Sequence, residues 1–139
     1  MTQHVRDIMT SRLVTVEPQA SVTAVAQKMR DEDIGAVLII EGDELRGLVS
    51  DRDLVVRALA EGDDPKQTTV ASACSSEVIT VTPDENLDHA VELMREHSIR
   101  RLPVVEEGHP VGIISLGDLA IERDEESALG DISAANPNQ

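Results

Sequence analysis

Aromatic side chains are absent from this sequence. No Phe, Tyr or Trp occurs among its 139 residues, and the apolar 40% consists of aliphatic residues, Met and one Cys. Proteins that hold single-stranded nucleic acid stack the bases on aromatic rings, so the sequence argues against that class. Any ring that this protein binds has to lie between aliphatic side chains or against the backbone.

Basic residues are also scarce. The chain has 12 Lys and Arg against 27 Asp and Glu, which gives a net charge of -15. Because binding to DNA or to an anionic membrane requires a basic surface, we predict no nucleic-acid partner and no membrane partner. No segment approaches the roughly 20 apolar residues of a membrane-spanning helix, and the N-terminus "MTQHVRDIMT" lacks the apolar centre of a signal peptide. We therefore expect a cytoplasmic protein.

Residue patterns of catalysis and of metal binding are missing as well. Cys74 is the one cysteine, so no disulfide can form within the chain. His89 and His97 are eight residues apart on one expected helix, about two turns, which is too far for side-by-side ligation of one ion, and we expect all four histidines on the surface. No nucleophile elbow, phosphate-binding loop or dinucleotide-binding glycine pattern is present. The sequence thus predicts no enzyme, no catalytic residue, no metal and no required cofactor.

What the sequence does contain is the same unit twice. Residues 5–54 align with residues 70–119, a shift of 65 positions without a gap. Identical residues include the pairs Thr15 and Thr80, Val16 and Val81, Pro18 and Pro83, Ile34 and Ile99, Gly47 and Gly112, Ser50 and Ser115, and Asp53 and Asp118. We predict a first unit over 1–60, a linker over 61–69, a second unit over 70–123 and an acidic, mobile tail over 124–139.

Within each unit the apolar period changes in a fixed order. The first unit has a β-rich run at 13–16, helical spacing of Val22, Val25, Ala26 and Met29, a continuously apolar strand at 36–40, a strand ending at Ser50, and a helix with Leu54, Val55 and Ala58 inward. Each unit is therefore predicted as strand, helix, strand, strand, helix. The fold class is α/β (α+β), with two β-α-β-β-α units packed about a pseudo-twofold axis.

A polar pair recurs where the last strand of each unit ends. It consists of Ser50 and Asp53 in "GLVSDRDL" and of Ser115 and Asp118 in "GIISLGDL". One interpretation is a capping box, in which Ser and Asp bind each other's backbone at the start of a helix. The other is a ribose site, in which the carboxylate accepts hydrogen bonds from a vicinal diol and the hydroxyl adds another. Both interpretations are compatible with the residue types.

Three arginines stand near these pairs. Arg100 and Arg101 replace Gly35 and Ala36 of the first unit, so the repeated scaffold does not require charge there. Arg52 adds a guanidinium at the other strand end. A guanidinium can form a bidentate contact with phosphate, which a lysine does less well. The alternative is ion pairing with the abundant carboxylates.

These segments together resemble the cystathionine-β-synthase (CBS) domain family in its tandem arrangement, the Bateman module. The resemblance is carried by "VTVEP" and "ITVTP", by "IGAVLIIEGDELRGLVSDRDL" and by "SIRRLPVVEEGHPVGIISLGDL". In length the chain is similar to stand-alone two-CBS proteins, including the actinobacterial hypoxic-response type. The resemblance implies two clefts between the paired CBS units.

The resemblance also implies residue roles. Ribose would be held by Ser50, Asp53, Ser115 and Asp118, phosphate by Arg100, Arg101 and Arg52, and adenine by Thr15, Val16, Pro18, Ile34, Thr80, Val81, Pro83 and Ile99. We expect Arg100 to face the Asp118 cleft together with Arg52, and Arg101 to reach the Asp53 cleft, so that the two clefts are unequal.

The function that this implies is a non-enzymatic regulatory module. It would bind AMP, ADP, ATP or another adenosyl compound, form a homodimer and signal to a protein partner. The alternative is a ligand-free structural or adaptor homodimer, in which Ser and Asp only cap helices.

Overall fold

The computed structural model describes residues 3–74 and 78–123, which form two compact units. The predicted tail over 124–139 lies outside the described residues. One unit lies within residues 14–78 and is called the Asp53 unit here; the other combines residues 3–13 with residues 79–123 and is called the Asp118 unit.

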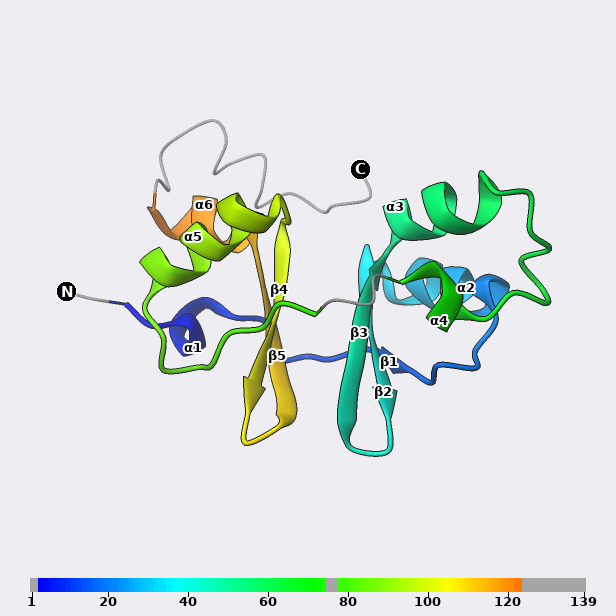
Figure 1. Ribbon diagram of the computed structural model, residues 1–139. Coiled ribbons are helices and arrows are strands. Elements are labelled where there is room, and N and C mark those ends of the chain that lie inside the picture. The colour runs from blue at the N-terminus through cyan, green and yellow to red at the C-terminus, as the bar shows by residue number, and fades with distance from the viewer. Residues whose placement is uncertain (1–2, 75–77, 124–139) are drawn as a thin grey trace. The chain divides into compact units, whose positions relative to one another are not determined.

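The Asp53 unit contains one small sheet with helices on one side of it (Figure 1). Its elements are β1 (Thr15–Val16), α2 (Val22–Glu32), β2 (Ala36–Glu41), β3 (Glu44–Ser50), α3 (Asp51–Leu54), the π-helix η1 (Val55–Leu59) and α4 (Val70–Ala73). The sheet order is β1-β2-β3. β1 runs parallel to β2, and β2 forms an antiparallel hairpin with β3.

The Asp118 unit repeats this plan with a smaller sheet. Its elements are α1 (Val5–Ile8), α5 (Leu87–His97), β4 (Arg101–Glu106), β5 (His109–Ser115) and α6 (Leu116–Arg123). β4 and β5 form an antiparallel hairpin. The first strand expected here is reduced to a single parallel bridge between Val81 and Val104.

The two units exchange the segments that begin each sequence repeat. α1, at the start of the first repeat, belongs to the Asp118 unit: the Val5 N–H donates to the Glu85 carbonyl at 2.9 Å, and the Thr10 N–H donates to the Ile113 carbonyl at 2.8 Å. α4, at the start of the second repeat, belongs to the Asp53 unit. The sequence repeats and the structural units therefore differ in their leading segments.

The predicted linker is bonded to the Asp53 unit and leads into α4. The N–H groups of Val22 and Thr23, at the start of α2, donate to the carbonyls of Thr68 and Pro65 at 2.9 and 3.0 Å. The Val70 N–H then donates to the Ala20 carbonyl at 2.7 Å. These bonds satisfy free N–H groups at a helix start and place α4 beside it.

The two long helices begin and end as local chemistry predicts. The Ser21 hydroxyl accepts from the Ala24 N–H at 3.0 Å, and the Asn86 side chain accepts from the His89 N–H at 3.0 Å. Asp33 is the C-cap that follows α2, and Ser98 is the C-cap that follows α5. Asp33 and Ser98 are left-handed, with φ of 57° and 54°, the conformation that commonly stops a helix.

Each unit has its own apolar core. The Asp53 unit buries Val22, Val25, Met29, Val37, Ile39, Val49, Leu54, Ala58, Val70 and Ala73. The Asp118 unit buries Val5, Val81, Leu87, Ala90, Met94, Leu102, Val104, Ile114 and Leu119. The apolar periodicity of the sequence thus identifies most of the helical core positions.

The expectation that Val55 points inward is wrong. Val55 is 55% exposed, whereas Leu54 and Ala58 are buried. The helix changes to π form at Val55, and the Ala60 N–H donates to the Val55 carbonyl at 2.9 Å. Leu54 and Ala58, four residues apart, share the face that meets the core, and Val55 lies beside that face.

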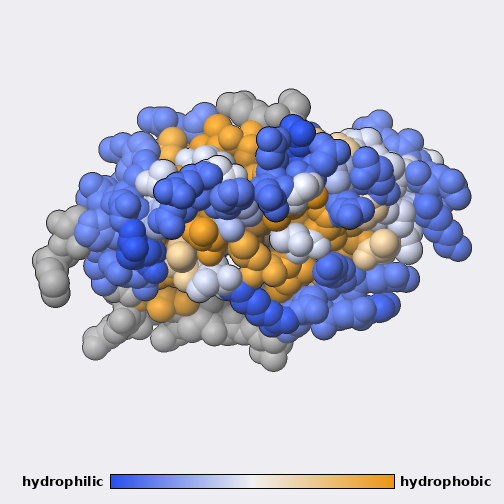
Figure 2. Space-filling model, turned by 90° about the horizontal axis from the view of Figure 1, so that it is seen from below, coloured by the Kyte–Doolittle hydropathy of each residue, from blue (hydrophilic) through white to orange (hydrophobic). Residues whose placement is uncertain are grey.

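The face shown in Figure 2 carries both hydrophilic and apolar residues. Large hydrophilic areas cover the face in Figure 2, with apolar residues exposed between them. The large apolar residues that are exposed in the described part of the chain are Val55, Val56, Leu59 and Leu116. Within residues 3–74 and 78–123, no helix combines the length and apolar character needed to cross a membrane.

Candidate functional site

Both polar pairs form complete capping boxes. Ser50 ends β3, and its hydroxyl accepts from the Asp53 N–H at 3.1 Å while the Asp53 Oδ2 accepts from the Ser50 N–H at 2.8 Å. In the Asp118 unit, the bonds between Ser115 and Asp118 measure 3.0 and 2.9 Å. The capping interpretation is therefore confirmed for both copies.

A capping box does not use the whole carboxylate. The backbone bonds in both copies go to Oδ2, and a carboxylate has lone pairs on both oxygens. The Asp53 side chain is 27% exposed, and its Oδ1 lies outside the box. Because the box fixes the side chain, the remaining acceptor is held in place before any ligand arrives.

Asp53 has a partner that the sequence analysis missed. The Arg57 Nε lies 3.6 Å from the Asp53 Oδ1. The spacing of Asp53 and Arg57 could have predicted this pair, because residues four apart on a helix lie on one face.

Arg100 and Arg101 lie beside the Ser115 box in the same unit. Arg101 is the register partner of Ser115 in the hairpin of β4 and β5. The Arg100 carbonyl accepts from the Leu116 N–H at 2.8 Å. Arg100 is exposed and Arg101 is half-buried, and neither forms an ion pair with the side chains that the structure describes. The ion-pair alternative is therefore not realised for these two residues within that part of the chain.

The Asp53 unit has the same backbone arrangement without these cations. Ala36 is the register partner of Ser50, and the Gly35 carbonyl accepts from the Asp51 N–H at 2.9 Å. Arg52 is exposed, and its backbone N–H donates to the Asp51 Oδ1 at 2.8 Å. Arg100 and Arg101 thus add charge to a scaffold that forms without it.

Three of the residues assigned to adenine line two depressions in the Asp53 unit. Thr15 and Val16 line a depression of about 700 Å³ together with Lys28. The Lys28 Nζ donates to the Thr15 carbonyl at 2.9 Å. Ile34 lines a different depression and also packs against the core.

Most of the equivalent residues of the second repeat are buried or pack against the core. Val81 and Pro83 are buried, Thr80 is exposed, and Ile99 packs against the core. The Pro83 carbonyl accepts from the Arg6 N–H at 3.0 Å.

The same use of proline occurs in the first repeat. The Pro18 carbonyl accepts from the Ala71 N–H at 3.2 Å. Both prolines therefore bond the leading helices.

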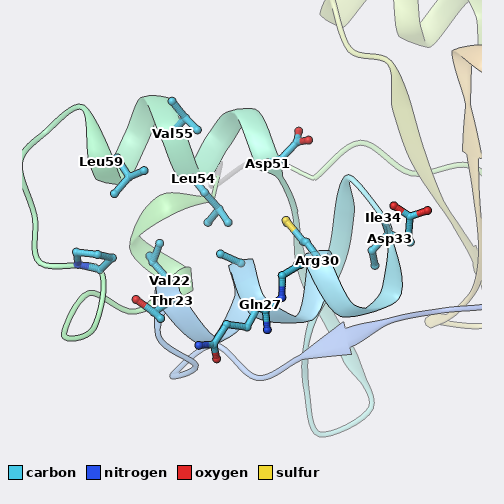
Figure 3. Close-up of a pocket in the computed structure, with 13 residues that line it drawn as sticks. Val22, Thr23, Gln27, Arg30, Asp33, Ile34, Asp51, Leu54, Val55 and Leu59 are labelled. Carbon is cyan, nitrogen blue, oxygen red and sulfur yellow. The ribbon is translucent and has the colours of Figure 1, made fainter. Parts of the chain in front are cut away.

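The depression that contains Ile34 is a groove between α2 and the helix formed by α3 and η1 (Figure 3). Its volume is about 700 Å³. Leu54, Val55 and Leu59 contribute apolar side chains to it, and Arg30, Asp33 and Asp51 contribute charged ones. Ile34 is the only predicted ligand contact among the residues that line it.

Cys74 lies within electrostatic range of the Asp53 box. Burial raises the pKa of the Cys74 thiol, the Asp53 carboxylate raises it further, and Arg57 lowers it. A raised thiol pKa is typical of a structural rather than a reactive cysteine.

No metal-ligating cluster occurs in the described part of the chain, since no three His, Cys, Asp or Glu side chains gather there. His4, His89, His97 and His109 are all exposed, as expected.

The fold and the two boxes define a protein of two tandem α/β repeats, each ending a hairpin in a capped helix. The CBS domain pattern matches residues 5–59 and residues 70–124. The chain belongs to the CBS domain family, and the predicted fold class is confirmed.

Similar proteins occur in several bacteria. The CBS domain-containing protein YhcV of Bacillus subtilis is 38% identical over 126 residues, which covers 91% of this chain and 89% of YhcV. The crystal structure of Hypoxic Response Protein I with two coordinated zinc ions has a TM-score of 0.78 and 36% identity, and the match covers 86% of this chain and 98% of that one. The resemblance to stand-alone CBS proteins of the hypoxic-response type is thus confirmed.

A more distant structure agrees in fold. The CBS domain pair of MJ0100, solved with 5-methylthioadenosine and S-adenosyl-L-methionine, has a TM-score of 0.83 at 24% identity, and the match covers 91% of this chain and all of that pair. At this identity the likeness concerns the fold alone.

Proposed function

We propose that this protein is a non-enzymatic regulatory module that binds an adenine nucleotide or another adenosyl compound at its Ser and Asp boxes. The observation that carries this proposal is the position of Arg100 and Arg101. They border the Ser115 box without an ion pair to any side chain that the structure describes.

The boxes supply the ribose contacts. A vicinal diol donates two hydrogen bonds, and a carboxylate is the acceptor that matches it. Oδ2 keeps its backbone bond and has a further lone pair, while Oδ1 lies outside the box. Ser115 fixes the Asp118 side chain, so little rotamer freedom is lost on binding.

The arginines supply the phosphate contacts. Their guanidinium groups form charge-assisted hydrogen bonds that act at contact distance. The negative field of the whole protein is screened over about 8 Å at physiological ionic strength. An anionic nucleotide is therefore compatible with an acidic protein. The prediction that Arg101 and Arg52 each act across to the opposite unit stays a prediction.

The remaining parts of the proposal concern recognition and signalling. Aliphatic side chains such as Ile34 and Ile99 contact the adenine ring, because no aromatic residue is available. The protein acts in the cytoplasm, where adenine nucleotides are made and consumed. A ligand with different affinities for two arrangements of the protein shifts their populations. A protein partner then binds one of these arrangements in preference to the other.

A thermal-shift screen with AMP, ADP, ATP, NAD and S-adenosylmethionine tests the proposal. Ligand at 100 times its Kd stabilises the folded state by about 2.7 kcal/mol, so a binder raises the melting temperature clearly. Arg100→Ala and Arg101→Ala should reduce the shift by AMP, and Arg95→Ala, an exposed position on α5, is the matched control. Unchanged melting temperatures at near-millimolar ligand would refute the proposal.

A second candidate function is favoured by two observations. The capping boxes are complete without a ligand, and Val55 and Leu59 expose apolar surface at the groove of the Asp53 unit. Both fit a structural or adaptor homodimer that acts through protein contacts. Sedimentation of the wild type and of Leu59→Asp tests it: a dimer that Leu59→Asp dissociates supports this function, and a wild-type monomer at all concentrations contradicts it.

A further inference from the structure

The two boxes are equivalent in sequence but differ in their charged neighbours. The Asp53 Oδ1 has the Arg57 Nε at 3.6 Å. The interactions described for Asp118 both lie inside its own box. The residue four positions after Asp118 is Glu122, which has the opposite charge to Arg57. Four positions after the aspartate, the first repeat therefore has a cation and the second has an anion.

Arg57 reaches Asp53 because of the local helix geometry. Asp53 lies in the first turn of α3, and Arg57 lies in η1, one turn later. The Arg57 side chain is 51% exposed and that of Asp53 is 27% exposed, so the pair is partly solvated. Both charges also act on Cys74, whose pKa the carboxylate raises and the guanidinium lowers. Arg57 thus lies at the oxygen that the box leaves free.

The surroundings of each box reinforce the difference. Gly35 and Ala36 lie beside the Ser50 box in the places that Arg100 and Arg101 take beside the Ser115 box. The cation near Asp53 is thus Arg57, whose Nε lies 3.6 Å from the carboxylate. The cations near Asp118 sit on the neighbouring strand, and none of the side chains that the structure describes forms an ion pair with its carboxylate.

We propose that Arg57 is a specificity-determining residue that acts as an internal counter-ion of Asp53. It competes with a ligand diol for Oδ1, so the Asp118 box binds a nucleoside first and the Asp53 box binds it more weakly. This inference rests on the proposed function. A partly exposed ion pair of this kind contributes at most about 1 kcal/mol, so its removal strengthens nucleoside binding at the Asp53 box by about two- to fivefold.

The test measures adenosine and AMP binding by titration calorimetry. Asp118→Asn leaves the Asp53 box as the remaining site, and Arg57→Gln is added to it. We expect adenosine to bind two- to fivefold more tightly to the double variant than to Asp118→Asn alone. Arg57→Lys should restore the weaker value, since it keeps the charge. Arg46→Gln is the matched control, because Arg46 pairs with Glu41 and Glu44 on the hairpin of the same unit.

Two further arms separate the possible outcomes. In an Asp53→Asn background, Arg57→Gln should have no effect on adenosine, because Arg57 acts through Asp53. The inference is wrong if Arg57→Gln does not strengthen adenosine binding at the Asp53 box. It is also wrong if the substitution only weakens the binding of AMP, because Arg57 would then act on the phosphate and not as a counter-ion. If neither adenosine nor AMP binds the wild type or any variant, the proposed function itself is refuted.

Discussion

The Met9 sulfur lies against the backbone of Gly112, where a Cβ atom on Gly112 would be only 2.7 Å from Sδ. The same Cβ would be 2.9 Å from the Thr10 carbonyl oxygen. In the other unit, Gly47 and Cys74 are the equivalent pair, and the distance from Cβ to Sγ would be 3.3 Å. Each leading segment thus packs on a glycine of the hairpin, and the fit is tighter in the Asp118 unit.

Gly112→Ala should therefore be more destabilising than Gly47→Ala. The Thr10 carbonyl is backbone and cannot rotate away from an added methyl group, so we expect a loss of about 1 to 3 kcal/mol in the free energy of unfolding. Gly47→Ala meets a side chain at an easier distance and should cost less. Urea unfolding of both variants measures the difference, and equal losses would contradict this account.

Asp118→Asn and Asp118→Ala should separate capping from ligand binding. The amide oxygen of Asn can still accept from the Ser115 N–H, so the stability without ligand should change little. Ala removes that acceptor and should cost about 1 kcal/mol. Both variants should lose AMP binding at this box, because the diol needs the charged carboxylate. Chemical denaturation and calorimetry measure the two effects, and an unchanged number and affinity of AMP sites in Asp118→Asn would remove the carboxylate from the site.

Ser98→Gly should stabilise the protein. Ser98 ends α5 with φ of 54°, a conformation that costs a residue with a Cβ about 1 kcal/mol and glycine little. We expect the free energy of unfolding to rise by up to that amount, less the greater entropy of glycine in the unfolded chain. Ser98→Ala keeps the Cβ and is the control. A melting temperature that falls in Ser98→Gly would show that the hydroxyl contributes more than the backbone strain.

Alkylation of Cys74 should report the charges around Asp53. Burial first, and then Asp53, raise the pKa of the thiol, so the thiolate forms at higher pH than in a free cysteine. Iodoacetamide should react slowly at pH 8 and faster after unfolding. Asp53→Asn should lower the pKa and speed the reaction, whereas Arg57→Gln should raise the pKa and slow it. Equal rates in the two variants would show that neither charge acts on the thiol.

The same shift predicts how stability depends on pH. The folded state binds the thiol proton more tightly than the unfolded state, so the contribution is complete below the unfolded pKa and is lost as the pH rises through the folded one. Cys74→Ser should flatten this alkaline decline. Urea midpoints between pH 8 and pH 10 measure it, and parallel declines in both proteins would assign the loss to other groups.

Local features of the fold were predictable from the sequence, and features that depend on distant contacts were not. The helices at 22–32 and 87–97 follow from apolar spacing and from the caps at Ser21 and Asn86, all within one segment. The exposure of Val55 was not predictable, because Val55 and Leu59 have the same apolar spacing as Leu54 and Ala58, and the spacing does not say which pair meets the core. The exchange of leading segments was missed as well, since an ungapped repeat contains no information on which copy each segment joins.

The candidate site divides in the same way. Each box joins a Ser and an Asp three positions apart, so this spacing was sufficient to predict it. The positions of Arg100 and Arg101 follow from the strand register, which the repeat also indicates. By contrast, Thr15 and Ile34 line different depressions, because one lies on the edge strand and the other after α2. Their common role was implied by resemblance and stays a prediction.

The exchanged leading segments make the order of the chain matter for assembly. Residues 3–13 precede the Asp53 unit in the chain but belong to the unit that follows it. A chain with a single repeat would have to fold its own leading segment back or borrow one from another molecule. Joining two repeats turns that borrowing into an intramolecular step, which raises the effective concentration of each segment. A cut between the repeats would therefore leave two fragments, each carrying a segment that the other requires.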